Sequence, residues 1–199
     1  VSLTNVDDLA PTVSSVTPAD NSTNIALASS LSATFSEALK TNSVYTNSNT
    51  TACANASSTV LLSTDNFTTC LGLGTPAFSD NQSFSIVPTS PGLAYDKTYQ
   101  LRIKGGTGGV SDTAGNPLAS SHTVSFSTPV RPRLTATVPD NNSTAVSRYS
   151  ALSLTFSKDM NTQTFAGISS SPQLQGTSAY TSSTYTYTFT PSGPLSDNT

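Results

Sequence analysis

The chain has 199 residues and a net charge of −3, with 10% charged and 35% hydrophobic residues and a pI near 4.7. Serine and threonine make up roughly a third of it, and no run of lysine or arginine occurs. Without a basic patch, electrostatic attraction cannot drive binding to nucleic acid or anionic lipid, so we expect no nucleic-acid partner. No stretch reaches the ~20 apolar residues of a membrane helix, so we expect a chain that does not span the membrane.

The first residues, VSLTNVDDLA, contain neither the charged nor the apolar region of a signal peptide. We therefore expect any signal peptide to have been removed or to lie upstream. Residues 1–10 are interpreted as a linker or as the tail of a preceding domain.

Short segments that alternate apolar with hydroxyl-bearing residues follow along the chain. In LSATFS, the apolar residues Leu31, Ala33 and Phe35 alternate with serine and threonine. This period of two predicts strands with one face on a core and the other in water. The same pattern predicts strands at 12–16, 31–36, 82–87, 98–104 and 122–128 in the first part of the chain.

The connections between these strands are rich in turn-forming residues. The phrase PADNST, which begins at Pro18, predicts a proline-led turn. The stretch 36–44 is ambiguous, since it suits a single helical turn. The glycine run 105–109 lacks the Lys-Ser/Thr ending of a phosphate-binding loop, so a flexible connection is the better interpretation.

The two cysteines, Cys53 and Cys70, lie in one polar segment. An even number of cysteines in such a segment favours a local disulfide and an oxidising compartment over two free thiols. A metal site is less favoured, because only two thiolates and no nearby histidine are present.

The sequence around Pro18 occurs a second time in the chain. PDNNST begins at Pro139, and the following LSLTFS (152–157) repeats LSATFS without a gap. The interval from Pro11 to Pro132 gives a period of 121 residues, which is typical of one sandwich domain. Further strands are predicted at 133–138, 152–157 and 184–190, the last with Tyr185 and Tyr187 on one face.

These patterns predict an all-β protein of tandem Ig-like or fibronectin III-like β-sandwiches. The first domain is predicted over residues 11–129 and the second over 130–199, with the stiff linker VRPR at their junction. The second copy lacks counterparts of the strand at 99–103, of the DTAGNPL turn and of the closing strand. Three explanations stay open: a fragment of a longer array, a domain completed by another molecule, or a loosely folded remnant.

The first domain resembles the bacterial Ig-like domains of the type found in the S-layer protein SbsA. The resemblance rests on APTVSSVTPADNSTNI, LSATFSEAL, LAYDKTYQLRI, GGVSDTAGNPLASS and VSFST, in that order. It implies a tandem module of a surface protein, and it implies that some relatives bind calcium near domain junctions.

The turn DTAGNPL is interpreted first as structural: Asp112 caps it, Gly115 takes a positive φ and Pro117 ends it. The alternative is a calcium site, because carboxylate and amide oxygens suit a hard cation. The calcium candidates are Asp7, Asp8, Asp112, Asn116 and Asp140. No other cofactor is expected.

No catalytic pattern stands out. The single histidine, His122, lies in a predicted strand, and no Gly-x-Ser-x-Gly elbow appears. We therefore predict a protein that is not an enzyme: a structural or adhesive Ig-like module of a secreted or cell-surface bacterial protein, in an extracellular, oxidising location.

The expected partners are neighbouring Ig-like domains and an unidentified host, matrix or glycan ligand. The insert at 45–80 is the first candidate for a contact surface, because functional contacts concentrate on loops. Its candidate residues are Tyr45, Asn47, Asn49, Asn55 and Asn66. Two alternatives stay open: a self-assembling fibre or surface-layer subunit completed by strands from a neighbour, and an accessory module of an extracellular enzyme.

Overall fold

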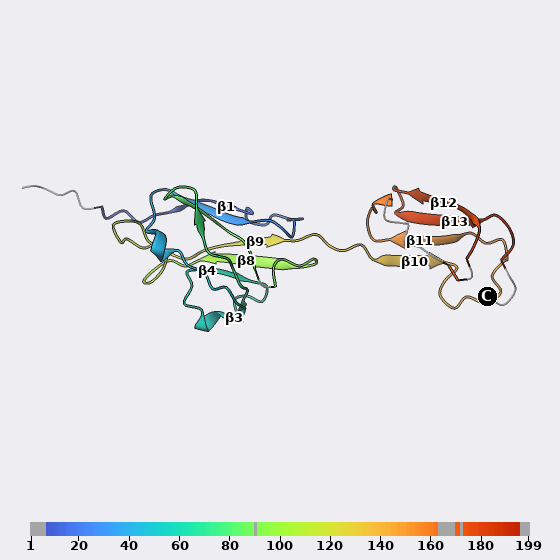
Figure 1. The fold of residues 1–199 in the computed structure, drawn as a ribbon, viewed down its shortest axis with the longest axis horizontal. Helices are drawn as coiled ribbons and strands as arrows, with labels where there is room; N and C mark the ends of the chain where they lie inside the picture. The colour runs from blue at the N-terminus through green and yellow to red at the C-terminus, as the bar shows by residue number, and fades with distance from the viewer. Residues whose placement is uncertain (1–6, 90, 163–169, 172, 196–199) are drawn as a thin grey trace, which may run out of the picture. The chain divides into compact units, whose positions relative to one another are not determined.

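The structure is a computed structural model, which describes residues 7–89, 91–162, 170–171 and 173–195. The chain divides into two compact units, Val1–Val130 and Arg131–Thr199. Each unit is all-β and carries its own sheets (Figure 1). In the described residues, no helix is long and apolar enough to span a membrane.

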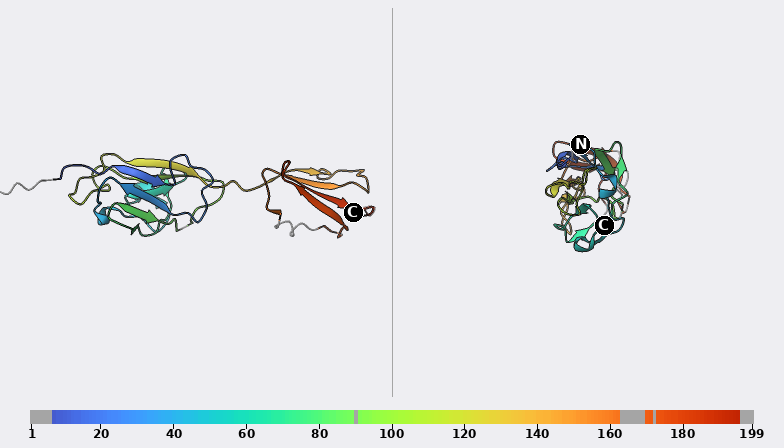
Figure 2. Two further views of the ribbon diagram at one scale, coloured as in Figure 1. Left: turned by 90° about the horizontal axis from the view of Figure 1, so that it is seen from above. Right: turned by 90° about the vertical axis from the view of Figure 1, so that its left-hand side faces the viewer.

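The first unit is a β-sandwich of two main sheets, whose layers can be followed in two further views in Figure 2. One sheet has the order β1-β2-β7-β6 and the other the order β4-β8-β9. The strands of the first sheet are β1 (Val13–Thr17), β2 (Leu31–Phe35), β6 (Ala77–Phe78) and β7 (Ser83–Ile86). Those of the second are β4 (Val60–Ser63), β8 (Thr98–Ile103) and β9 (His122–Ser127).

The core of the first unit lies between these sheets and follows the alternation in the sequence. Leu31, Ala33 and Phe35 are at most 2% exposed, and the serine and threonine between them are half-buried on the outer face. From the other sheet, Tyr99 and Phe126 stack with ring centroids 5.5 Å apart. Period-two patterning therefore places one side of every long strand in a common core.

Between β1 and β2 the chain changes sheets. Residues 21–25 leave the first sheet and run parallel to β9, with a bridge between Ser22 and Phe126. Asn21 N donates to Ser125 O (2.6 Å), Ile25 N donates to Ser127 O (3.0 Å), and Ser127 N donates to Ser22 O (2.8 Å). This segment closes an edge of β9 that would otherwise be unpaired.

The insert at 45–80 forms a small substructure. It contains the 3-10 turn η2 (Cys53–Asn55) and the two-stranded sheet of β3 (Thr51–Ala52) and β5 (Thr69–Cys70), and the 3-10 turn η1 (Thr41–Ser43) comes just before it. The turn η1 lies inside the stretch 36–44 that was ambiguous in sequence. The predicted disulfide between Cys53 and Cys70 is present.

The second unit consists of one sheet in its described residues, with the order β10-β11-β13-β12. Its strands are β10 (Leu134–Val138), β11 (Leu152–Phe156), β12 (Gly176–Thr181) and β13 (Thr186–Pro191). The order matches β1-β2-β7-β6, and the bulge after Leu134 repeats the bulge after Val13. The sequence repeat is thus also a repeat of topology and register.

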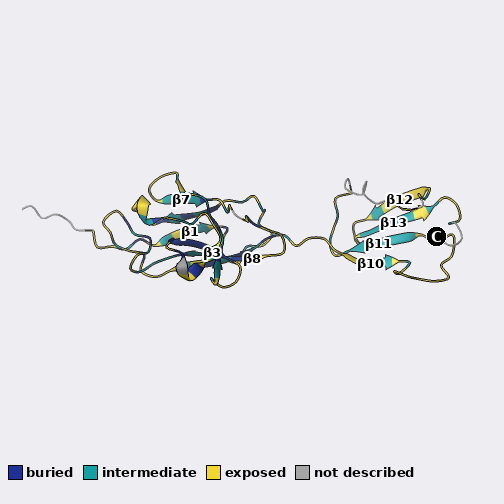
Figure 3. Ribbon diagram, turned by 60° about the horizontal axis from the view of Figure 1, so that its bottom comes forward, coloured by how far each residue is buried: buried dark blue, intermediate teal, exposed yellow. Residues whose placement is uncertain are grey.

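The two copies differ in burial. All buried residues of the described chain belong to the first unit, and β11 is half-buried throughout. Figure 3 shows this as dark blue ribbon in the first unit, against teal and yellow in the strands of the second. The second unit therefore has the sheet of a sandwich but not the burial of one.

Most predicted strands are present within a residue or two of their expected bounds. The strands that the patterns missed are β3, β4, β5, β6 and β12. Four of them lie in the insert or next to it, and β4 is buried along its whole length, which removes the alternation. The fold class is all-β, as predicted.

Candidate functional site

The turn that starts at Asp112 is held by that residue's carboxylate. Asp112 is 1% exposed, and its Oδ1 accepts hydrogen bonds from Gly115 N (2.6 Å) and Asn116 N (2.8 Å). Gly115 has a φ of 100°, which a side chain would strain. Burial alone would raise the pKa of Asp112, but the hydrogen bonds from Asn116 and Gly115 outweigh it and hold that pKa below 3.8. The predicted structural role of this turn is therefore present.

Asn116 joins this turn to the segment that enters the unit. Its Nδ2 donates to Asp7 O (3.0 Å), Leu9 O (3.2 Å) and Asp112 Oδ2 (2.8 Å). Three acceptors around one amide nitrogen fix the entering chain beside the turn. Since its side-chain nitrogen faces these acceptors, Asn116 holds the entering segment to the turn by donating hydrogen bonds, and it does not direct its side-chain oxygen toward a cation.

Glu37 completes a cluster of three carboxylates that the sequence did not predict. Ligand oxygens of Asp7, Glu37 and Asp112 all lie within 4.8 Å of one another. Glu37 Oε1 is buried and accepts no hydrogen bond. Burial, and then the charges of Asp7 and Asp112, raise the pKa of Glu37 above 4.5. Either a proton or a cation would relieve this repulsion.

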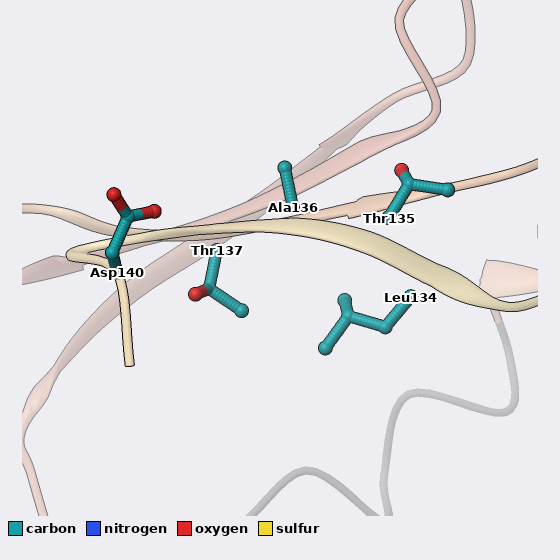
Figure 4. Close-up of a pocket in the computed structure, with 5 residues that line it drawn as sticks. All are labelled: Leu134, Thr135, Ala136, Thr137 and Asp140. Atoms are coloured by element: carbon teal, nitrogen blue, oxygen red, sulfur yellow. The ribbon is translucent and has the colours of Figure 1, made fainter. Parts of the chain in front are cut away.

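The other calcium candidates lie outside this cluster. Asp8 is exposed and is not one of the three clustered acids. Asp140 belongs to the second unit, where it lines an open depression of about 270 Å³ along β10. Figure 4 shows Thr135 and Ala136 on one side of β10 and Leu134 and Thr137 on the other, as the bulge requires. This depression presents one carboxylate and is a poor cation site.

The acidic cluster is not repeated in the second unit. The position that matches Glu37 holds Lys158, and the position that matches Asp7 holds Thr128. Glu37 is also the only glutamate of the chain. The lysine at the matching position and the absence of any other glutamate are the two signals in the sequence that set Glu37 apart.

The insert is cross-linked and internally packed. Cys53, Ala56, Leu61 and Cys70 form a second small core, with Phe67 packed against it. The guanidinium of Arg102 lies 3.6 Å from the centre of the Phe67 ring. This arrangement joins the tip of the insert to β8 by a cation–π contact.

The loop at the tip of the insert is ordered by Asp65. Its Oδ1 accepts from Thr69 N (2.8 Å) and from Ser63 Oγ (2.8 Å). These hydrogen bonds, that of the Thr69 backbone first, lower the pKa of Asp65 below 3.8. These hydrogen bonds define the conformation of the loop between β4 and β5.

The five predicted contact residues are placed differently from one another. Asn49 and Asn66 are exposed, and Tyr45 is 39% exposed. Asn47 is half-buried: its Nδ2 donates to Asn49 O, and its Oδ1 is buried without a partner. The side chain of Asn55 lies outside what the structure describes. Asn47 is therefore partly buried within the insert, whereas Tyr45, Asn49 and Asn66 are accessible to solvent.

The predicted tyrosine pair of the second unit does not form. Tyr187 is half-buried on β13, opposite Leu154, whereas Tyr185 lies in the turn before β13 with a φ of 54°. Because Tyr185 is outside the ladder, strand alternation does not apply to it. The stripe of two aromatic rings was a wrong prediction.

A family model described as "Bacterial Ig-like domain" matches residues 7–128 and again residues 129–199. No curated protein has a detectable match to the chain.

Among solved structures, the S-layer protein rSbsC(31-844) is 15% identical, with a TM-score of 0.40, over 77% of this chain and 21% of that one. The N-terminal part of the bacterial S-layer protein SbsC is 18% identical, with a TM-score of 0.40, over 96% of this chain and 43% of that one. The chain thus spans less than half the length of either. At these scores, the likenesses establish no shared function.

Proposed function

Because the chain belongs to the bacterial Ig-like domain family, we propose that it is a non-enzymatic structural module of a bacterial cell-surface or secreted protein, acting as a spacer or adhesive repeat. Two tandem matches over residues 7–199 support this role. A cross-linked insert and a strand surface rich in hydroxyl groups suit an oxidising, extracellular location. A closer relation to the SbsA type of the family stays a prediction.

The observation that carries the spacer role is the contact between residues 21–25 and β9. The chain enters the first unit before β1 and leaves it after β9, so tension pulls these two parallel segments in opposite directions along their length. The bonds from Asn21, Ile25 and Ser127 lie across that direction and are loaded together. Such an arrangement resists pulling better than one in which bonds break in turn.

Forced unfolding of single molecules tests this role. Ile25→Pro removes the amide that donates to Ser127 O, whereas Ile25→Ala keeps it and loses a similar apolar contact. We expect Ile25→Pro to lower the unfolding force of the first unit well below that of Ile25→Ala. Equal forces for the two variants would remove the mechanical argument for a spacer.

The disulfide provides an internal length standard in the same experiment. While the disulfide is intact, the segment from Cys53 to Cys70, a separation of 17 residues, cannot be extended by force. The double variant Cys53→Ala/Cys70→Ala should lengthen the unfolding step of the first unit by roughly 60 Å, at about 3.5 Å per extended residue. This change identifies which unfolding events belong to the first unit.

Surface location is tested separately on intact producing cells. An antibody against residues 7–130 should label unpermeabilised cells or the culture medium, with Cys53 and Cys70 oxidised. Signal confined to the cytosol, with both thiols free, would count against an extracellular role while leaving the mechanical result unaffected.

Contact with a ligand through the insert is a further part of this proposal. Asn49 and Asn66 are accessible there, on a substructure fixed by the disulfide and by Asp65. If this surface adheres, alanine at these two positions should reduce binding of purified protein to matrix or glycan arrays. Alanine at Asn81, which is exposed outside the insert, is the matched control.

Calcium binding stays a prediction at the cluster of Asp7, Glu37 and Asp112. The unpartnered Oε1 of Glu37 supports it. A bound cation would join the entering segment to the body of the unit, which would stiffen a spacer. Terbium luminescence of the full chain, with and without Glu37→Gln, measures whether a cation binds there.

A further inference from the structure

The outer face of the β1-β2-β7-β6 sheet consists of small, uncharged side chains. On β2, Ser32 and Thr34 alternate with the buried Leu31, Ala33 and Phe35, so they lie on the side away from the core. The register of β1 and β7 places three serines and a threonine beside these two residues. The hydroxyl groups of this face include those of Ser15, Thr17, Ser32, Thr34, Ser83 and Ser85.

The second unit has an equivalent face. Thr155 of β11 lies opposite Thr186 of β13, as Thr34 lies opposite Ser83, and the two hydroxyl oxygens are 3.2 Å apart in each pair. Leu154 points to the other side of the sheet, so the composition of this face does not depend on what packs against that residue. The hydroxyl groups here include those of Ser153, Thr155, Thr177, Thr181, Thr186 and Thr188. These two surfaces are the hydroxyl faces of the chain.

Neither hydroxyl face carries a charge. The eight strands of these two sheets contain no aspartate, glutamate, lysine or arginine. The other main sheet of the first unit differs, since β8 contains Arg102, whose guanidinium lies over the Phe67 ring of the insert. Solvent-facing surfaces ordinarily mix charges of both signs, and such charges on sheets hinder association between copies. The hydroxyl faces therefore lack the usual means of keeping identical surfaces apart.

A hydroxyl face is chemically complementary to a copy of itself. A serine or threonine hydroxyl both donates and accepts a hydrogen bond, whereas a carboxylate only accepts and an ammonium group only donates. Two uncharged faces also approach each other without the cost of placing like charges side by side. Charge and hydrogen-bonding capacity thus both favour a second copy of the chain as the partner.

Two other classes of partner fit these faces less well. The aromatic residues of the eight strands all lie on the inner faces, in register with the apolar residues of β2 or β11. A sugar ring therefore has no aromatic surface to stack on. An ionic polymer meets no opposite charge within these strands.

We propose that the hydroxyl faces are the surfaces through which copies of this chain pack side by side, sheet face against sheet face. Hydrogen bonds between serine and threonine hydroxyls, and contacts between threonine methyl groups, would form the interface. This inference goes beyond the spacer role and does not depend on it, because a spacer needs no lateral contact.

The size of each face predicts a weak contact that gains strength by repetition. Four strands about 4.8 Å apart, each of about five residues that rise about 3.3 Å, cover about 300 Å². A standard interface buries about 800 Å² on each partner, so one pair of faces is too small to hold a dimer by itself. Because each chain has two hydroxyl faces, the two contacts can add by avidity.

A concentration series of the full chain tests the proposal. As the concentration rises from about 50 μM to about 1 mM, we expect the weight-average mass in sedimentation to increase and amide resonances of the two sheets to shift. The shifts should be largest at Ser32, Thr34, Ser153 and Thr155, on the inner strands of the two sheets. Resonances of β8 and β9 should stay unchanged.

Charge variants locate the contact and separate it from a folding defect. Thr34→Lys/Thr155→Lys and Thr34→Asp/Thr155→Asp each place like charges on both faces, so each should weaken self-association about tenfold or more. An equimolar mixture of the two variants should associate again, to within about threefold of the wild type, because opposite charges then face each other. The control Thr64→Lys/Thr98→Lys alters two exposed threonines outside both faces and should associate as the wild type does.

Three outcomes would overturn the proposal. The wild type could stay monomeric at about 1 mM. The two charge variants could remain unassociated when mixed, which would mean that the faces do not meet each other. A neutral oligosaccharide such as cellohexaose could shift the resonances of Thr34 and Thr155 in a chain that does not self-associate, which would make a glycan the partner.

Discussion

At the scale of single residues, the entry to the first unit depends on how carboxylates are partnered. Asp112 accepts from two backbone amides and the Asn116 side chain, so it is stable as an anion although it is buried. Glu37 lies beside it with an oxygen that has no donor. The two acids therefore respond oppositely to pH: the pKa of Asp112 is lowered and that of Glu37 is raised.

The substitution Glu37→Gln tests this difference. Because the folded pKa of Glu37 lies above 4.5, its stabilising contribution is complete below pH 4.5 and is lost as the pH rises through the folded value. In a chelator, we expect Glu37→Gln to raise the melting temperature of the first unit at pH 7 and to have little effect at about pH 4.

A cation reverses the order of these melting temperatures. If calcium binds, it should raise the melting temperature of the wild type at pH 7 and that of Glu37→Gln much less. The variant Asp8→Asn, at an exposed acid outside the cluster, is the control. A Glu37→Gln variant that melts lower than the wild type at both pH values in chelator would show that Glu37 has an unrecognised partner.

Among the elements of the first unit, the insert has a disulfide and a small hydrophobic core of its own. Its two short strands pair over only two residues each, which is too little to hold a sheet alone. The disulfide joins η2, which directly follows β3, to the last residue of β5, and Phe67 packs against the small core around Cys53 and Cys70. The insert thus depends on its cross-link more than on its ladder.

Removal of the disulfide should therefore be costly. For a separation of 17 residues, the chain-entropy model gives about 3 kcal/mol of stabilisation. We expect Cys53→Ala/Cys70→Ala to lower the free energy of unfolding of the first unit by about this amount in urea. A loss below about 0.5 kcal/mol would mean that the insert unfolds separately from the sandwich.

The strands β2 and β11 are a second comparison of elements, since they have the same pattern in different surroundings. Phe35 is 2% exposed, and the centroid of its ring lies 6.0 Å from that of the Phe84 ring. Phe156, in contrast, is half-buried. The hydrophobic contribution of a side chain scales with the area it buries. Equivalent residues should therefore contribute unequally to stability.

Alanine substitution at the two phenylalanines measures this inequality. Phe35→Ala should cost about 3–5 kcal/mol of the free energy of unfolding of its unit, and Phe156→Ala less than half of that. Thr34→Ala and Thr155→Ala are matched controls, because each threonine makes an equivalent 3.2 Å contact between hydroxyl groups. Equal costs for the two phenylalanines would show that the face of β11 is already covered.

At the scale of the whole molecule, the two units differ in how complete their cores are. In the part of the chain that the structure describes, the large core is formed by residues between Leu31 and Phe126, all within the first unit. Among described residues of the second unit, none is buried. Stability should accordingly be distributed unevenly along the chain.

Calorimetry should therefore resolve two transitions in the full chain. We expect residues 7–130, expressed alone, to melt within about 2 °C of the upper transition, because their core needs nothing from the second unit. The lower transition should be broad and should belong to residues 131–199. A single cooperative transition, or a first unit that melts much lower when isolated, would contradict independent units.

Features that depend on local pattern could be predicted from the amino-acid sequence. Alternation of apolar and hydroxyl side chains located β2, β8, β9 and β11, because a half-covered sheet imposes a period of two. The repeat at a period of 121 residues predicted that the chain contains the same sheet twice. Asp112 and Gly115 predicted their turn because an Asx turn is made within five residues. Two nearby cysteines predicted the disulfide.

Features that depend on residues distant in sequence became visible once the chain was folded. Glu37 meets Asp112 because Leu39 bridges to Asp112 across 73 positions, and no local pattern encodes that pairing. Asn47, predicted as a contact residue, is half-buried. All four residues of β4 are buried, so this strand shows no alternation. The half-buried face of β11 has the same sequence pattern as the buried face of β2. Burial is a property of what packs on a strand, so the strand's own residues cannot specify it.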